Sequence, residues 1–129
     1  MSICALMREV YSALDNGSLR LAAMGIRAAL ENLMIEKVGD RQSFKANIDA
    51  LQKAGYLSLR QAVALDTILE AGHAAVHRQW KPKSGDIDTV LEITNTLIES
   101  VYLHEESVRN LDKRVPKRPR PNRTPQNGA

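Results

Sequence analysis

The chain has 129 residues, of which 43% are hydrophobic and 26% charged, a size and balance typical of one soluble globular domain with a single core. The net charge is +3, but six of the 18 basic residues and none of the 15 acidic residues lie from Lys113 onward, which leaves an acidic body. The folded part is therefore not a basic nucleic-acid domain, and no apolar run approaches the ~20 residues of a membrane span.

Five helices are predicted in chain order, and no segment has the pattern of a strand. Ser18, Ser43 and Ser58 are suited to N-cap positions, and glycines such as Gly39 mark helix ends. The expected ranges are 2–15, 18–38, 43–55, 59–78 and 86–110. Short connections favour antiparallel neighbours, so the expected fold class is an all-α, five-helix antiparallel bundle.

The second helix is apolar on two sides, which is typical of a helix that is central or packs at a subunit interface. Its broad face consists of Leu19, Ala22, Ala23, Ile26, Leu30, Leu33 and Met34. A second apolar patch consists of Leu21, Met24, Ala28 and Ile35. Arg20, Arg27 and Glu31 lie between the two, and Arg27 and Glu31, at i and i+4, could pair.

The fourth helix carries a line of polar, titratable side chains along the border of an apolar face. The polar line is Asp66, Glu70, His73 and His77, and the apolar face is Ala62, Leu65, Leu69 and Val76. The two carboxylates should favour protonated histidines.

The histidine pair has three interpretations. The first is a polar border in which Asp66, Glu70 or the backbone satisfies both imidazoles. The second is a metal site, but a second Glu-x-x-His motif is missing and Ala74 replaces the glutamate of a His-Glu-x-x-His motif. The third is a nuclease-like or nucleotide-contacting site. We expect no metal and no cofactor.

The C-terminal tail, residues 113–129, is basic and rich in proline, so we expect it to be disordered beside a helical domain at 1–112. Such a tail is either a solvated end or a grip on RNA or DNA that reads no sequence. The candidate nucleic-acid contacts are Lys117, Arg118, Arg120 and Arg123.

Cysteine usage and the first residues bear on the compartment. Cys4 is the only cysteine, which excludes an internal disulfide, and we interpret it as a small core residue. Arg8 and Glu9 interrupt the pattern of a signal peptide, so we expect a cytoplasmic location and no membrane partner.

Several segments together resemble the family called domain of unknown function 4145. Ile26-Arg27-Ala28-Ala29-Leu30-Glu31 is similar to its Arg-x-x-Leu-Glu signature, and Gly72-His73-Ala74-Ala75-Val76-His77 to its Gly-Asn-x-x-x-His signature. The middle section and the ending also fit, through Phe44, Ile48, Leu51, Gly55 and Val115-Pro116-Lys117-Arg118-Pro119. The resemblance covers the chain from about Leu6 to Pro119.

That family is grouped with the HEPN superfamily, which the resemblance implies is all-α, usually dimeric, and rich in ribonucleases of toxin–antitoxin, restriction and other defence systems. Active members carry an arginine, a polar residue, three variable residues and a histidine on a late helix at the dimer interface. His77 would be the histidine and His73 the polar residue, but Gly72 stands at the arginine position. Glycine cannot stabilise charge on phosphate, and Arg27 could do so if the second and fourth helices pack together.

Two hypotheses follow. In the first, the chain is a non-catalytic HEPN-like binding and dimerisation module, an adaptor or a fragment of a restriction, defence or toxin–antitoxin system with a protein partner. In the second, it is a metal-independent endoribonuclease in which His77 acts as general acid/base, His73 positions phosphate and Arg27 supplies the positive charge. We favour the first, because of Gly72 and the acidic body.

Overall fold

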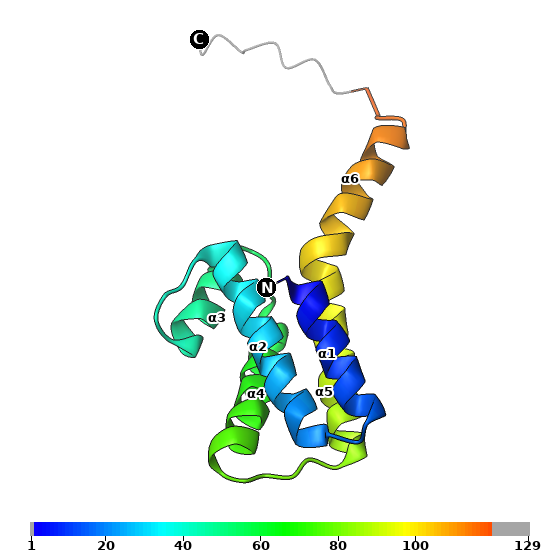
Figure 1. The fold of residues 1–129 in the computed structure, drawn as a ribbon. Coiled ribbons are helices and arrows are strands. Elements are labelled where there is room, and N and C mark those ends of the chain that lie inside the picture. Colours follow the sequence, from blue (N-terminus) through cyan, green and yellow to red (C-terminus); the bar gives the residue numbers. More distant parts are fainter. Residues whose placement is uncertain (1, 120–129) are drawn as a thin grey trace.

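The computed structural model describes residues 2–119, and within that range it contains helices and no strand (Figure 1). The expected all-α antiparallel bundle is confirmed. The helices are α1 (Ile3–Asp15), α2 (Leu19–Val38), α3 (Phe44–Lys53), α4 (Leu59–His77), α5 (Ser84–Ile98), the π-helical segment η1 (Glu99–His104) and α6 (Glu105–Arg114).

Serines begin the helices as the sequence predicts. The hydroxyls of Ser2, Ser43 and Ser58 each accept a hydrogen bond from a backbone N–H of the first turn that follows, at 3.1–3.2 Å. Ser18 stands at the N-cap of α2, but its side chain makes no capping bond. The start of α2 therefore keeps amide groups that no side chain satisfies.

α2 is the central helix of the bundle and packs against α1, α3, α4 and α5 (Figure 1). Its broad apolar face supplies much of the core, including the fully buried side chains of Ile26, Leu30 and Met34. Its second apolar patch faces outward, since Leu21 is 59% and Ile35 37% exposed. Of the two apolar sides of α2, one thus lies in the core, and the other is left exposed within the described chain.

The expected fifth helix begins two residues earlier and runs further than predicted. It begins at Ser84 because the Asp86 carboxylate accepts a 2.9 Å hydrogen bond from the Lys83 N–H. α5, η1 and α6 follow one another without a break, and α6, which has no buried residue, projects beyond the other helices (Figure 1). Lys113 and Arg114 lie in the last turn of α6.

A polar contact holds η1 against α2. The Tyr102 hydroxyl donates a 2.8 Å hydrogen bond to the Glu36 carboxylate, and the Lys37 ammonium lies 4.6 Å from the centre of the Tyr102 ring. Burial, and then the bond to Glu36, raise the pKa of the Tyr102 hydroxyl well above its ordinary value. The neutral tyrosine is thus the form that the folded chain stabilises.

Two smaller expectations are wrong. Cys4 is exposed rather than a core residue. Val76 is 44% exposed, and Ala75 takes its place on the buried side of α4, because Gly72 and Ala75 turn toward the core.

None of the helices within residues 2–119 combines the length and the apolar character needed to cross a membrane.

Candidate functional site

The site begins with a close crossing of α2 and α4 at Gly72. A Cβ atom added to Gly72 would lie 2.6 Å from the Cβ of Arg27 and 3.2 Å from the carbonyl oxygen of Ala23. The first distance is too short for any side chain, so only glycine allows this approach. Gly72, which stands on α4 where the resemblance leads one to expect an arginine, is therefore the residue against which the stem of Arg27 packs.

The head of Arg27 is held by groups from two other helices. Its Nη1 lies 3.2 Å from Nδ1 of His73 on α4, and its Cζ lies 4.1 Å from the centre of the Phe44 ring on α3. Arginine can only donate, so Nδ1 of His73 accepts and the ring proton lies on Nε2. Stacking on Phe44 and the bond to His73 together fix the plane of the guanidinium group.

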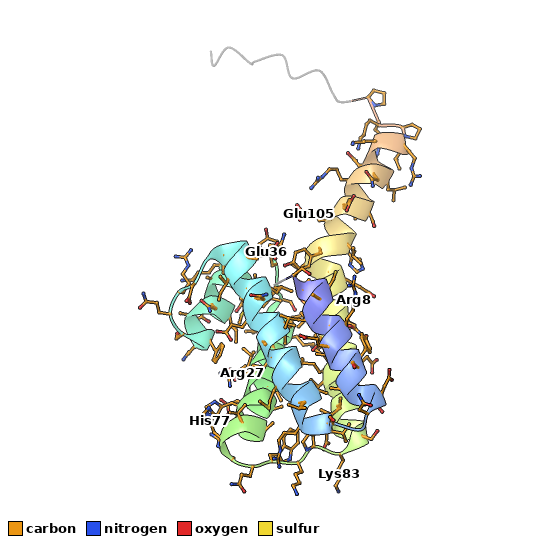
Figure 2. The ribbon with its side chains drawn as sticks, in the orientation of Figure 1. Arg8, Arg27, Glu36, His77, Lys83 and Glu105 are labelled. Atoms are coloured by element: carbon orange, nitrogen blue, oxygen red, sulfur yellow. The ribbon has the colours of Figure 1, made fainter. Side chains whose placement is uncertain are left out.

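His77 lies beside this pair, one turn further along α4. The centres of the His73 and His77 rings are 4.5 Å apart, with the rings tilted by 43°. His73 is partly buried and His77 is exposed. Figure 2 shows Arg27 and His77 on the same side of the bundle. We call Arg27, His73 and His77 the Arg27–histidine cluster. Its formation depends on the packing of α2 against α4, which the structure shows.

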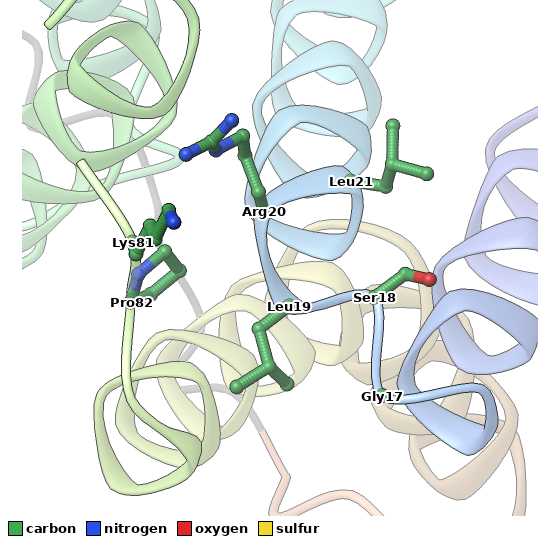
Figure 3. A pocket seen from close by; sticks show the side chains of 7 residues that line it. All are labelled: Gly17, Ser18, Leu19, Arg20, Leu21, Lys81 and Pro82. Carbon is green, nitrogen blue, oxygen red and sulfur yellow. The ribbon is translucent and has the colours of Figure 1, made fainter. Parts of the chain in front are cut away.

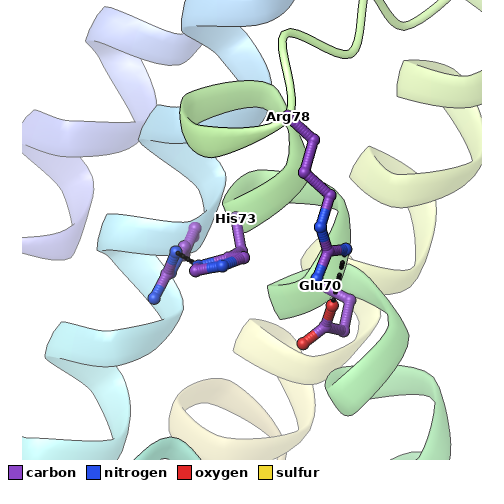
Figure 4. Close-up of polar contacts among 4 residues, drawn as sticks. Glu70, His73 and Arg78 are labelled. Atoms are coloured by element: carbon purple, nitrogen blue, oxygen red, sulfur yellow. Dashed lines mark hydrogen bonds and ion pairs between the residues drawn. The ribbon is translucent and has the colours of Figure 1, made fainter.

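The acidic residues expected to support the histidines form no ion pair with Arg27, His73 or His77 within residues 2–119. Glu70 pairs with Arg78 at 3.4 Å, and both side chains are largely exposed (Figure 4). Asp66 is exposed and Glu31 is partly buried. Within residues 2–119 neither of them forms an ion pair, so the possible pair between Arg27 and Glu31 is not formed. Among the described residues the charge of Arg27 thus has no carboxylate partner.

Other candidate sites are less organised. In the part of the chain that the structure describes, no three His, Cys, Asp or Glu residues come together as a metal site would require. In the tail, Lys117 pairs with Asp112 and Arg118 is exposed, while Arg120 and Arg123 lie outside the described residues.

Two participants were missed by sequence reasoning. Phe44 was assigned only to the core pattern, yet its ring carries the guanidinium group of Arg27. Arg20 was seen only as a polar residue between two apolar faces, yet it lines a cleft at the start of α2. Arg20 lies two turns before Arg27 on the same face of the helix, and this spacing could have indicated that the two arginines act together.

Comparison with known proteins gives one match. A family model described as a domain of unknown function, DUF4145, matches residues 8–118. No curated protein and no solved structure matches the chain.

Proposed function

This chain belongs to the DUF4145 family, and we propose that it is a HEPN-like helical module that dimerises and binds RNA in a nucleic-acid-processing or defence system. One observation carries the proposal: the guanidinium group of Arg27 is fixed by Phe44 and His73 and has no carboxylate partner among residues 2–119. A fixed, unneutralised guanidinium is suited to a phosphate oxyanion, which it can contact with two parallel N–H groups.

The resemblance to the HEPN superfamily supports the same assignment of roles. An active member would have an arginine where this chain has Gly72, directly before His73. Here the stem of Arg27 packs on Gly72, and its head contacts His73. The cation that α4 lacks is thus supplied from α2, next to the same histidines.

The exposed patch of α2 supports a homodimer. Leu21, Ala28 and Ile35 are all exposed, and on a helical wheel their stripe borders the row of Arg20, Arg27 and Glu31. The small Ala28 at the centre allows a second copy of α2 to approach closely, with Leu21 of each copy near Ile35 of the other. The Arg27–histidine clusters of the two copies would then flank one interface.

Light scattering with size-exclusion chromatography tests the dimer. Ile35→Glu should convert a dimer into a folded monomer, because it buries an unpaired charge in the interface. Val63→Glu, at an exposed valine of α4, is the matched control and should leave the mass unchanged. A monomeric wild-type chain would overturn this part of the proposal.

Fluorescence anisotropy with a short labelled single-stranded RNA tests the binding function. Arg27→Gln should lower affinity about tenfold or more, because a charge-assisted contact to phosphate is lost. Arg8→Gln removes the same charge from an exposed position on α1, on the opposite side of the view in Figure 2, and should have little effect. Equal affinity of the wild type and Arg27→Gln would refute the assigned site.

A metal-independent endoribonuclease is the second candidate, and the proximity of His77 to His73 and Arg27 favours it. In that mechanism His77 takes the proton of the RNA 2′-hydroxyl, whose oxygen attacks the adjacent phosphorus. The bond from phosphorus to the 5′-oxygen of the next nucleotide breaks, that oxygen leaves with the proton returned by His77, and a 2′,3′-cyclic phosphate remains. His73 positions the phosphate and Arg27 stabilises the charge that develops on it. Cleavage of labelled RNA in EDTA should then be lost in His77→Ala and kept in His104→Ala, which alters an exposed histidine of η1. Cleavage that persists in His77→Ala would eliminate this mechanism.

A further inference from the structure

A cleft of about 340 Å³ lies at the start of α2, between the α1–α2 turn and the loop from α4 to α5 (Figure 3). Arg20 from the first turn of α2 and Lys81 from the loop both line it, together with Pro82 and Ser18. No acidic residue lines the part of the cleft that residues 2–119 form. Two cations therefore line one concave surface, and its described lining contains no acidic side chain.

Arg20 is held in this cleft without a hydrogen-bonding partner for its Nε. That atom is buried and unsatisfied in the described chain, and the side chain as a whole is only partly exposed. A cation that is partly removed from water and left unpaired costs free energy, and an anion in the cleft would offset that cost. Since Nε is itself closed off, an anion in the cleft would act on the charge of the partly exposed side chain rather than bond to Nε.

The start of α2 adds to the same field. The Ser18 hydroxyl does not cap the helix, and no acidic residue lies in its first turn. The free amides and the positive end of the helix dipole consequently remain available to an anion. The helix N-terminus would contribute less to anion binding than the two side-chain cations, Arg20 and Lys81.

The cleft lies in line with the Arg27–histidine cluster. Arg20 precedes Arg27 by seven residues, which is two turns on one face and about 10 Å along α2. α4 runs antiparallel to α2, so the chain that continues past His77 brings Lys81 to the Arg20 end (Figure 1). A single phosphate cannot reach both places, whereas a strand with phosphates at regular intervals can.

We propose that Arg20 and Lys81 form a second phosphate subsite, which binds a phosphodiester of the same RNA strand that Arg27 contacts. This inference rests on the proposed function and adds the path of the strand, along the α2–α4 seam toward the α1–α2 turn. The shared chemistry is a phosphate oxyanion, so free phosphate and an RNA phosphodiester must be distinguished.

The test measures RNA affinity by anisotropy over a series of salt concentrations, using a short labelled oligouridylate. Arg20→Gln and Lys81→Gln should each reduce the slope of log affinity against log salt by about 0.7, the value for one lost cation on a single strand. Arg8→Gln should leave the slope unchanged. In parallel, amide NMR signals of Leu19 to Leu21 are followed during titration with inorganic phosphate, in the wild type and in Arg20→Gln.

The outcomes separate the two proposals. Reduced slopes in both cleft variants support the subsite. A reduced slope in Arg27→Gln alone overturns the subsite and leaves the proposed function standing. No RNA binding by the wild type, with phosphate-dependent shifts that Arg20→Gln abolishes, refutes the proposed function but supports an anion site for free phosphate. No RNA binding and no shifts overturn both.

Discussion

α2 crosses two neighbours closely, and a glycine makes each crossing possible. At the crossing with α1, a Cβ added to Gly25 would lie 2.9 Å from Cγ2 of Val10. At the crossing with α4, a Cβ added to Gly72 would lie 2.6 Å from Cβ of Arg27. In the first case the neighbour is a buried aliphatic side chain, and in the second it is the stem of an arginine.

The two crossings differ in their consequence: one only packs the core, and the other also places the side chain of Arg27. Val10 ends at the contact, so the first crossing can only fill the core. Arg27 continues past Gly72 for the length of its side chain and contacts Phe44 and His73. Close helix packing at a glycine therefore stabilises the bundle where α2 meets α1, and it orients the Arg27 guanidinium where α2 meets α4.

The largest expected effect comes from Gly72→Ala, compared with Gly25→Ala. The new Cβ at position 72 meets Cβ of Arg27 and the Ala23 carbonyl, so the helices must separate, at about 2 kcal/mol of unfolding free energy. Gly25→Ala should cost about 1 kcal/mol, because only one methyl group must move and helix propensity offsets part of the strain. Urea unfolding measures both.

RNA binding sharpens the same comparison. Gly72→Ala should also lower the RNA affinity of the folded protein, because it displaces Arg27, whereas Gly25→Ala should leave it unchanged. Equal losses of affinity in the two variants would contradict the distinction between packing and placement.

Double-mutant cycles give the next largest effect. Val10→Ala removes the methyl group that Gly25→Ala contacts, so the two changes should be coupled by about 1 kcal/mol in the favourable direction. Arg27→Ala removes Cδ, which lies 3.0 Å from the new Cβ, but keeps the closer Cβ at 2.6 Å, so the coupling there should be smaller than in the first cycle. Strong coupling in the second cycle would mean that the arginine head, rather than the helix spacing, causes the strain.

The smallest expected effect lies outside both crossings, at Tyr102. Its pKa is raised in the folded chain, so below about pH 10 both states keep the proton and the stabilisation is fully present. Above that pH the unfolded chain loses the proton first, and stability falls. The wild type should exceed Tyr102→Phe by about 1 kcal/mol or less at neutral pH, and the difference should shrink in alkaline unfolding experiments. A difference that is constant with pH would exclude this linkage.

The sequence contains most of the architecture but only part of the site. Serine caps and glycine stops predict the helix boundaries, because these signals are local. The two-sided pattern of α2 predicts its central place, and Arg27 was expected near His77 if α2 and α4 packed together. The contact between the Phe44 ring and Arg27 depends on where α3 lies. The ion pair between Glu70 and Arg78 depends on how α4 ends. Neither contact has a local signal that the sequence could provide.

The most direct test of the central claim, that α2 supplies the cation that α4 lacks, exchanges the two residues. Arg27→Gly removes the Cβ and Cδ atoms that block position 72 and leaves the 3.2 Å contact with the Ala23 carbonyl oxygen. Gly72→Arg then places a guanidinium on α4 before His73. The double variant should fold, as judged by circular dichroism, and should bind labelled RNA more tightly than Arg27→Gly alone. An exchanged protein that folds but binds RNA no better than Arg27→Gly would contradict the claim.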